Sequence, residues 1–454
     1  MDVGIVRQVM IGIVCNLLLI DCGMNEGWST PIIPKFNHED PLKMTGDEIA
    51  WVVNLMYVGV GIGSIVPYLL MDRVGRKGTL LFATVPKIAS WIIIGVANSV
   101  TQLYIGRIIA GIGCGITYSV MPMYLGEVTS KRTRGPLGTL LTVLLNLGML
   151  LAYAIGLSVS RLTMALISLS LPISFLLTFI WLPESSIFLM RKSKLASAER
   201  TLKWSLGKED VEEELEEIKR IVSTDEQSMK ISRKLPWREM FSRPENRRAF
   251  LIALILMSAL TLTGAAPILA YQSYIYEEAG FEISTNLSIV VTGCAIVIGG
   301  STCVLLVKRI GKRPLLMLAT PICILSLLVI ACFFASRSAG YDVSQFKWIP
   351  TVFVTVYVLG YGVALNPIPL AYIGEIFHVE VKVLGAIFSA LYYALTTTAV
   401  IKVYQVMQES YGIHAPVLMF AAITSFIWVL IYRHVPETEG KTLEEILIEL
   451  RRKV

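Results

Sequence analysis

Twelve apolar stretches, each long enough to cross a lipid bilayer, run through this chain of 454 residues. A helix needs about 20 mostly apolar residues to span the hydrocarbon core. Hydrophobic residues make up 54% of the sequence and charged residues only 16%, a composition typical of membrane proteins. We therefore predict an all-α membrane protein with twelve transmembrane helices, at residues 8–32, 47–70, 79–98, 102–126, 136–158, 162–182, 249–274, 285–307, 314–335, 348–374, 383–408 and 415–432.

Positive charge gathers on one side of the predicted spans. About 32 of the 40 Lys and Arg residues fall in alternate loops and in the tail. The positive-inside rule makes that side cytoplasmic, so we expect both termini in the cytoplasm. This placement explains the net charge of +6 without nucleic-acid binding. The first apolar run is long enough to span and shows no signal-peptide cleavage site.

Residues that usually hold metals or perform covalent chemistry form no pattern here. The seven cysteines lie within or near the predicted spans, and the four histidines are scattered near span ends. No nucleophile with its base and no phosphate-binding loop is recognisable. We therefore expect no metal, no cofactor and no enzymatic activity.

Motifs of the first half of the chain recur, in the same order, in the second half. Asp72-Arg73-Val-Gly75-Arg76-Lys77 corresponds to Lys308-Arg309-Ile-Gly311-Lys312-Arg313. Two further pairs lie about 240–250 residues apart: Pro122 and Glu127 with Pro369 and Glu375, and Pro183-Glu184-Ser185 with Pro436-Glu437-Thr438. Such a repeat predicts two six-helix halves, with a substrate site between them. We assign the halves to 1–182 and 249–434, a polar linker to 183–248 and a tail to 435–454.

The linker is predicted to form short amphipathic helices under the bundle. Leu215, Ile218 and Val222 fall on one helical face, and Glu216 and Arg220 are spaced to pair at i,i+4. The segment is too poor in apolar residues to form the core of an independent enzyme domain. We expect the helices to lie on the cytoplasmic side.

Charged residues also lie within the predicted spans, where they are costly unless they face protein or water. Arg107 belongs to a stretch of Ile, Ala and Gly and must therefore point into a bundle. Gly111 and Gly115 share a face of the same helix and allow a neighbouring helix to approach closely. Asp21 and Glu26 are functional candidates near the end of the first span, and solvation of Glu26 at the outer interface is the alternative.

Together these motifs resemble the sugar porter family of the major facilitator superfamily, over nearly the whole chain. The stretch Gly27-Trp28-Ser29-Thr30-Pro31 is most similar to the branch of insect facilitated trehalose transporter-like proteins. The resemblance implies the major facilitator fold, in which two halves tilt about a central cavity. The family signatures are matched by Asp72-Arg73-Val-Gly75-Arg76-Lys77, Gly106-Arg107, Pro122-Met-Tyr124-Leu-Gly-Glu127, Arg134-Gly135, Pro183-Glu184-Ser185, Glu375-Ile376-Phe377 and Pro436-Glu437-Thr438-Glu439-Gly440-Lys441-Thr442.

The resemblance also implies an inner gate held by ion pairs. Exposed pairs contribute about 0–1 kcal/mol each, so a network of them can hold one state without trapping it. The alternative is that these charges only set the topology. The matching residues are Asp72, Arg73, Arg76, Glu127, Arg134, Glu184, Arg309, Glu375 and Lys382.

Most of the positions at which the family contacts its sugar are replaced in this chain. The family has a glutamine at Thr142, a glutamine pair beginning at Leu260, a tryptophan at Leu370 and an Asn-Trp pair beginning at Tyr393. Each sugar hydroxyl left without a partner costs about 1–3 kcal/mol, so the substrate stays open. Polar residues of the same helices are the candidate substrate contacts: Thr142, Asn146, Thr261, Tyr271, Asn366 and Tyr393.

Proton coupling depends on a further pair. Proton-driven relatives carry an acid near the position of Ser29, paired with the arginine matched by Arg107, and a serine cannot titrate. Glu26 lies about one turn earlier and is placed to pair with Arg107 if the helix continues. We treat Glu26 and Arg107 as the candidate coupling pair.

We therefore expect a facilitative transporter that moves a sugar or a sugar-like, small, uncharged solute by alternating access at the plasma membrane. A membrane sensor that no longer transports and a proton-coupled symporter with an altered substrate are the alternatives. The expected partners are the solute and the lipid bilayer. The oligomeric state stays open.

Overall fold

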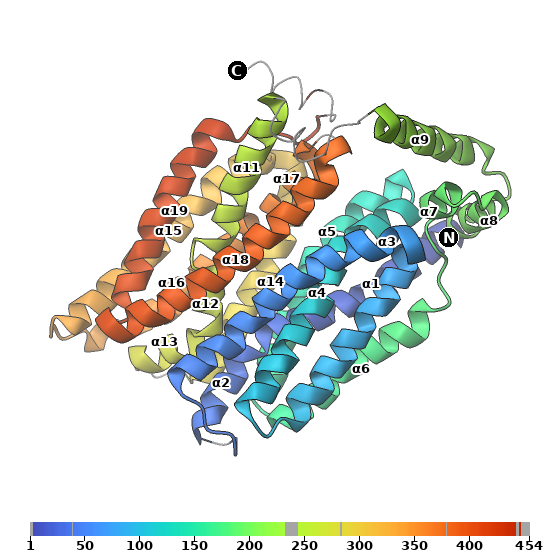
Figure 1. Cartoon of the computed structure of the whole chain (residues 1–454). Helices are drawn as coiled ribbons and strands as arrows, with labels where there is room; N and C mark the ends of the chain where they lie inside the picture. The colour runs from blue at the N-terminus through green and yellow to red at the C-terminus, as the bar shows by residue number, and fades with distance from the viewer. Residues whose placement is uncertain are drawn as a thin grey trace.

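The computed structural model describes residues 3–38, 40–231, 244–281, 284–377, 379–441 and 445. Two groups of helices lie side by side, with α7 to α9 at one end of the molecule (Figure 1). The first group comprises α1 (Val3–Gly27), α2 (Ser29–His38), α3 (Gly46–Val96), α4 (Val100–Val128), α5 (Lys131–Gly156) and α6 (Arg161–Phe179). The second comprises α11 (Pro244–Thr261), α12 (Ala265–Ala270), α13 (Gln272–Ala279), α14 (Thr285–Ile310), α15 (Lys312–Ser338), α16 (Trp348–Gly360), α17 (Pro367–Ile376), α18 (Val379–Tyr411) and α19 (His414–His434).

The prediction of an all-α membrane fold with twelve spans is confirmed. Ten segments of the described chain are long and apolar enough to cross a membrane. One of them is the 51-residue α3, which contains two predicted spans, and the shorter apolar helix 140–156 lies in the fifth predicted span. These two features account for the difference between ten segments and twelve passages.

The second and third spans are joined by a kink instead of a loop. Gly75 has φ 81° and ψ −178° inside α3, a conformation that side-chain-bearing residues rarely adopt. Gly311, its counterpart in the repeat, has φ 95° where α14 ends and α15 begins. The two glycines therefore form equivalent turns in the two halves.

Three spans are interrupted within the bilayer. The first breaks at Trp28, between α1 and α2, and the seventh breaks at Gly264, which has φ 86°. The tenth contains a wide π-type turn at Tyr361–Leu365, directly before the last helix of that span. Such breaks release backbone groups, which are tolerated in a membrane only where protein or water satisfies them.

Glycines let α3 and α4 pack with their backbones in contact. A Cβ atom added at Gly111 would lie 2.0 Å from the carbonyl oxygen of Met56, and one at Gly115 would lie 2.3 Å from that of Val60. The predicted close approach of a neighbouring helix at these two glycines is thus confirmed, and the neighbour is α3.

The segment between the halves forms three short helices, α7 (Ser186–Arg191), α8 (Leu195–Leu206) and α9 (Glu212–Ile231). The predicted apolar face of α9 is buried in a small separate cluster that includes Leu202 of α8. The predicted Glu216–Arg220 pair forms, with 3.9 Å between Oε2 and NH2. The N-terminus packs here as well, because Arg7 donates to the carbonyl of Trp204 at 2.9 Å.

The α3–α4 contact predicts the effect of a single methyl group. Gly111→Ala should destabilise the protein by about 1–3 kcal/mol, because the added Cβ forces two packed backbones apart. Gly126→Ala is the matched control, since nothing lies within 4 Å of a Cβ atom there. Thermal unfolding in detergent should show a lower midpoint for the first variant only. Equal midpoints would contradict the packing argument.

Candidate functional site

A charged cluster lies in the first half, at the end of the molecule that carries α7 to α9. Arg76 binds Glu127 through two contacts, Nε to Oε2 at 2.9 Å and NH2 to Oε1 at 3.0 Å. The Glu184 carboxylate accepts the backbone N–H groups of Arg76 and Lys77, each at 3.1 Å. Burial raises the pKa of Glu184, and backbone hydrogen bonds, first from Ser185, oppose that shift.

The second half repeats this cluster with different residues. Lys312 Nζ lies 2.7 Å from Glu375 Oε1 and 2.9 Å from Glu439 Oε2. Glu437 accepts the backbone N–H groups of Lys312 at 3.2 Å and Arg313 at 2.9 Å, as Glu184 does in the first half. Each carboxylate lies at the start of a helix, where unpaired N–H groups and the helix dipole favour an anion.

The predicted gate residues divide into two groups. Arg76, Glu127, Glu184 and Glu375 belong to the two clusters, and none of their contacts in the described chain joins one half to the other. Sequence reasoning omitted Lys312, although Lys312 is the residue of the second half that corresponds to Arg76 in the repeat. Asp72, Arg73 and Arg309 are exposed and form no ion pair within the described chain. The side chains of Arg134 and Lys382 lie outside the described residues.

Arg107 is buried inside the first half, as predicted, with only 1% of its surface exposed. Its guanidinium donates to the carbonyls of Val52 at 3.1 Å and Asn25 at 2.9 Å, and it lies 5.1 Å from the ring centre of Trp28. The break after α1 therefore supplies a carbonyl and an aromatic face that stabilise a cation in the membrane.

Glu26 and Arg107 form no hydrogen bond or ion pair within the described chain, although they are close enough to interact electrostatically. Glu26 accepts a hydrogen bond from the Tyr118 hydroxyl at 2.7 Å, and the contacts of Arg107 in the described chain do not include Glu26. One reason is geometric. Consecutive residues of a helix point about 100° apart, so Asn25 and Glu26 face different neighbours, and the helix ends at Gly27 before Ser29 is reached.

Asp21 has a partner that sequence reasoning missed. Lys87 Nζ lies 2.6 Å from Asp21 Oδ2, and both side chains are fully buried. Trp91 Nε1 donates to Asp21 Oδ1 at 2.6 Å, so both carboxylate oxygens are occupied. A lysine in the middle of an apolar span was the available signal, because a buried charge requires a partner. The pair joins α1 to α3.

The two halves meet at mid-depth through predicted substrate residues. Asn366 donates to Asn146 Oδ1 at 3.3 Å, and Asn146 donates to the carbonyl of Ile296 at 3.3 Å. Tyr393 packs edge-on against Tyr57 of the other half, with ring centres 6.0 Å apart. Three of the six predicted residues therefore lie where the halves touch.

Glu26 lies beside this meeting point and keeps accessible surface. It is close enough to interact electrostatically with Tyr57, Tyr361 and Tyr393. Its partner Tyr118 is also partly exposed, as are Asn366 and Tyr393. Polar side chains that remain accessible within membrane spans are available to a polar solute.

The other three predicted substrate residues lie elsewhere. Thr261 accepts from Thr396 at 3.0 Å within the second half, and Tyr271 stacks on Tyr404 with 5.5 Å between ring centres. Thr142 is partly exposed on α5. Sequence reasoning also missed Asn54, whose buried amide has no partner in the described chain. A lone asparagine in an apolar run was its signal.

Further contacts join the halves at the end opposite α7 to α9. Thr30 donates to the carbonyl of Leu269 at 2.7 Å. Lys402 Nζ and Gln405 Nε2 of α18 both donate to Asp47 Oδ1, at 2.6 Å and 3.0 Å. The interrupted first and seventh spans therefore meet at this end.

These features define a class: a multi-pass membrane protein built from two repeated helical halves, with polar residues where the halves meet. The family model described as "Sugar (and other) transporter" matches residues 10–450. The chain belongs to this family.

Curated relatives cover almost the whole chain. Facilitated trehalose transporter Tret1 of Bombyx mori is 28% identical over 444 residues, which cover 98% of this chain and 86% of that protein. The protein of the same name from Apis mellifera ligustica is 27% identical over 442 residues, covering 97% of this chain and 87% of its own length. Both are named as transporters.

Solved structures share the fold. A structure of the proton:xylose symporter XylE bound to 6-bromo-6-deoxy-D-glucose superposes with a TM-score of 0.78 at 18% identity, covering 97% of this chain and 99% of the other. The inward open conformation of the xylose transporter XylE from E. coli gives the same values. The major facilitator fold is therefore confirmed.

The buried pair predicts a large effect of removing one partner. Lys87→Met should destabilise the protein by about 3–5 kcal/mol, because it leaves the Asp21 carboxylate buried without its cation. Adding Asp21→Asn should recover most of this loss, since asparagine still accepts from Trp91. Thermal unfolding in detergent measures both.

Lys203→Met is the control for this experiment. Lys203 pairs with Glu199 at 2.9 Å, but both side chains are about 40% exposed, so the change should cost less than about 1 kcal/mol. If the Lys87 and Lys203 variants lower the midpoint of thermal unfolding equally, the buried pair contributes no more to stability than an exposed one.

Proposed function

We propose that this protein is a facilitative transporter that moves a sugar or a sugar-like, small, uncharged solute across the plasma membrane by alternating access. One observation carries the proposal. The halves are joined by contacts at mid-depth and at the end opposite α7 to α9, whereas the contacts of the Arg76 and Lys312 clusters in the described chain do not join one half to the other. In this arrangement the halves can tilt without breaking either cluster.

The moving units in this proposal are residues 1–182 and 249–434. Their surfaces bear few direct polar links, each of which contributes about 0–1 kcal/mol when exposed, so neither state is trapped. Both termini and the linker 183–248 face the cytoplasm. The abundance of basic residues at that end supports this orientation.

The solute would bind where Asn146, Asn366 and Tyr393 meet, with Glu26 and Tyr118 beside them. Amide, hydroxyl and carboxylate groups can donate to and accept from sugar hydroxyls, and the Tyr57 and Tyr393 rings offer apolar faces. The curated relatives are named as trehalose transporters, which makes trehalose the first solute to test. The replaced family positions make glucose the necessary comparison.

Uptake of labelled trehalose and glucose into proteoliposomes tests the proposal. Asn366→Ala should lower uptake about tenfold, because it removes a bond across the halves and one of the solute contacts. Asn16→Ala is the matched control: Asn16 is also an asparagine of a membrane span, but it donates to the carbonyl of Gly12 in its own helix at 2.7 Å. Uptake lost equally in both variants would contradict the assigned site.

The same vesicles separate the two alternatives. A sensor would bind solute without flux, so binding with no uptake of either sugar overturns the transport proposal. A proton-coupled symporter would accumulate solute against its gradient when the outside is acidified, and Glu26→Gln would abolish that accumulation. Facilitated transport predicts equilibration only, with no response to a pH gradient.

The Asp47–Lys402 contact predicts a shift between conformations. Lys402→Ala should favour the state open at the Asp47 end by no more than about fivefold, because Asp47 is 72% exposed. Spin labels at Thr101 and Tyr341 should report a larger population of long distances. Lys347→Ala removes an exposed lysine that makes no contact with the first half in the described chain, and an equal shift there would argue against the contact.

A further inference from the structure

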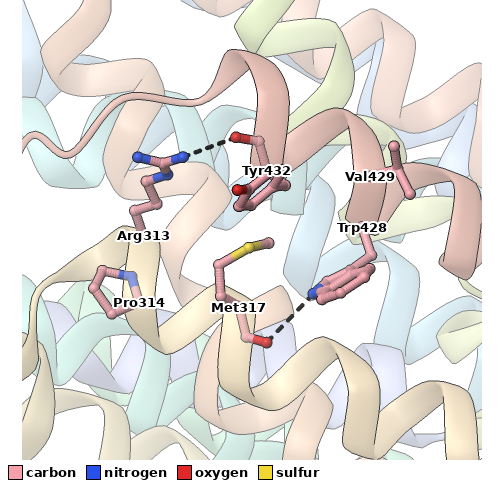
Figure 2. A pocket seen from close by; sticks show the side chains of 6 residues that line it. All are labelled: Arg313, Pro314, Met317, Trp428, Val429 and Tyr432. Atoms are coloured by element: carbon pink, nitrogen blue, oxygen red, sulfur yellow. Dashed lines mark hydrogen bonds between the residues drawn. The ribbon is translucent and has the colours of Figure 1, made fainter.

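A groove lies away from the meeting point of the halves, between the first turns of α15 and the last turns of α19. Its volume is about 770 Å³, and its lining is mostly apolar. Figure 2 shows the Arg313 guanidinium directed at the Tyr432 carbonyl and the Trp428 indole directed at the Met317 carbonyl. The groove is lined by Arg313, Pro314, Met317, Trp428, Val429 and Tyr432.

The Arg313 guanidinium has no acidic partner in the described chain. It donates to the carbonyl of Tyr432 at 2.8 Å and lies 5.9 Å from the ring centre of the same residue. The neighbouring acids are already engaged, since Glu375 and Glu439 bind Lys312. An arginine carries five N–H donors, so most of those on Arg313 remain open.

The groove opens on the face that meets lipid. On α15, Leu318, Ile322 and Leu325 are each about half exposed or more and follow the same helical face as Pro314. On α19, Phe426 is 64% exposed, three residues before Val429. Tyr432 and Trp428 lie near the helix end, where aromatic residues favour the interface between hydrocarbon and head groups.

The surroundings carry further positive charge. Lys308 and Arg309 lie in the last turn of α14, and Arg433 lies in the last turn of α19. All three are exposed. An anion of the head-group region is thus attracted to this end of the groove.

We propose that this groove binds one anionic glycerophospholipid, with its phosphate on Arg313 and an acyl chain along Met317 and Trp428. A planar guanidinium suits a phosphate because two N–H groups can donate to two oxygens at once. The apolar lining of the groove suits the acyl chain of the lipid. The site stands apart from the solute position and does not depend on the proposed transport function.

Native mass spectrometry of the delipidated protein in detergent tests the site. Phosphatidylglycerol should be retained about tenfold more tightly than phosphatidylcholine with the same acyl chains. Arg313→Gln should remove this preference. Arg313→Lys should keep part of it, because lysine keeps the positive charge but lacks the planar guanidinium that donates two N–H groups at once. Arg337→Gln removes a positive charge at the opposite end of α15 and should leave the preference unchanged.

The apolar half of the site has its own pair of variants. Trp428→Ala should weaken retention of both lipids, whereas Phe426→Ala, on the exposed face outside the groove, should not. Equal retention of the two lipids by the unmodified protein would overturn the proposal, as would equal losses in the Arg313 and Arg337 variants. Displacement of phosphatidylglycerol by millimolar inorganic phosphate would mark a site for free phosphate instead and would also overturn it.

Discussion

Hydrocarbon offers no hydrogen-bond partners, and the structure of this protein follows from that constraint. A charged group within a span is therefore stable only where protein or water compensates it. Arg107 finds carbonyls where the first span breaks, and Asp21 finds Lys87 and Trp91. The break at Trp28 is tolerated because it lies beside a buried cation, and the break at Gly264 because the Tyr357 hydroxyl donates to the carbonyl of Thr263.

The repeat then determines how the two halves relate. Each half closes its own charged cluster with the same elements: a glycine at positive φ, a following cation, a glutamate from the fourth or tenth span, and a carboxylate that accepts backbone N–H groups. The chemistry is preserved although Arg76 is replaced by Lys312. Stable halves joined by weaker contacts are the physical requirement for a tilting motion.

The candidate site was only partly predictable. Asn146, Asn366 and Tyr393 are polar residues in apolar runs, and the structure brings them to the meeting point of the halves. Tyr271 carries the same signal in the sequence but stacks on Tyr404 instead. Residue type identifies polar groups within a membrane, but it does not tell which of them face the partner half, because that depends on how the interrupted helices are rotated.

By itself the sequence determined the number of spans, the two-fold repeat, the burial of Arg107 and the helix contact at Gly111, because these depend on length, periodicity and local spacing. Only the tertiary structure decided that Asp21 pairs with Lys87, that Glu26 accepts from Tyr118, and that an open groove adjoins Arg313. Such contacts join residues far apart along the chain, and their geometry depends on the packing of whole helices. No local pattern of residues encodes that packing.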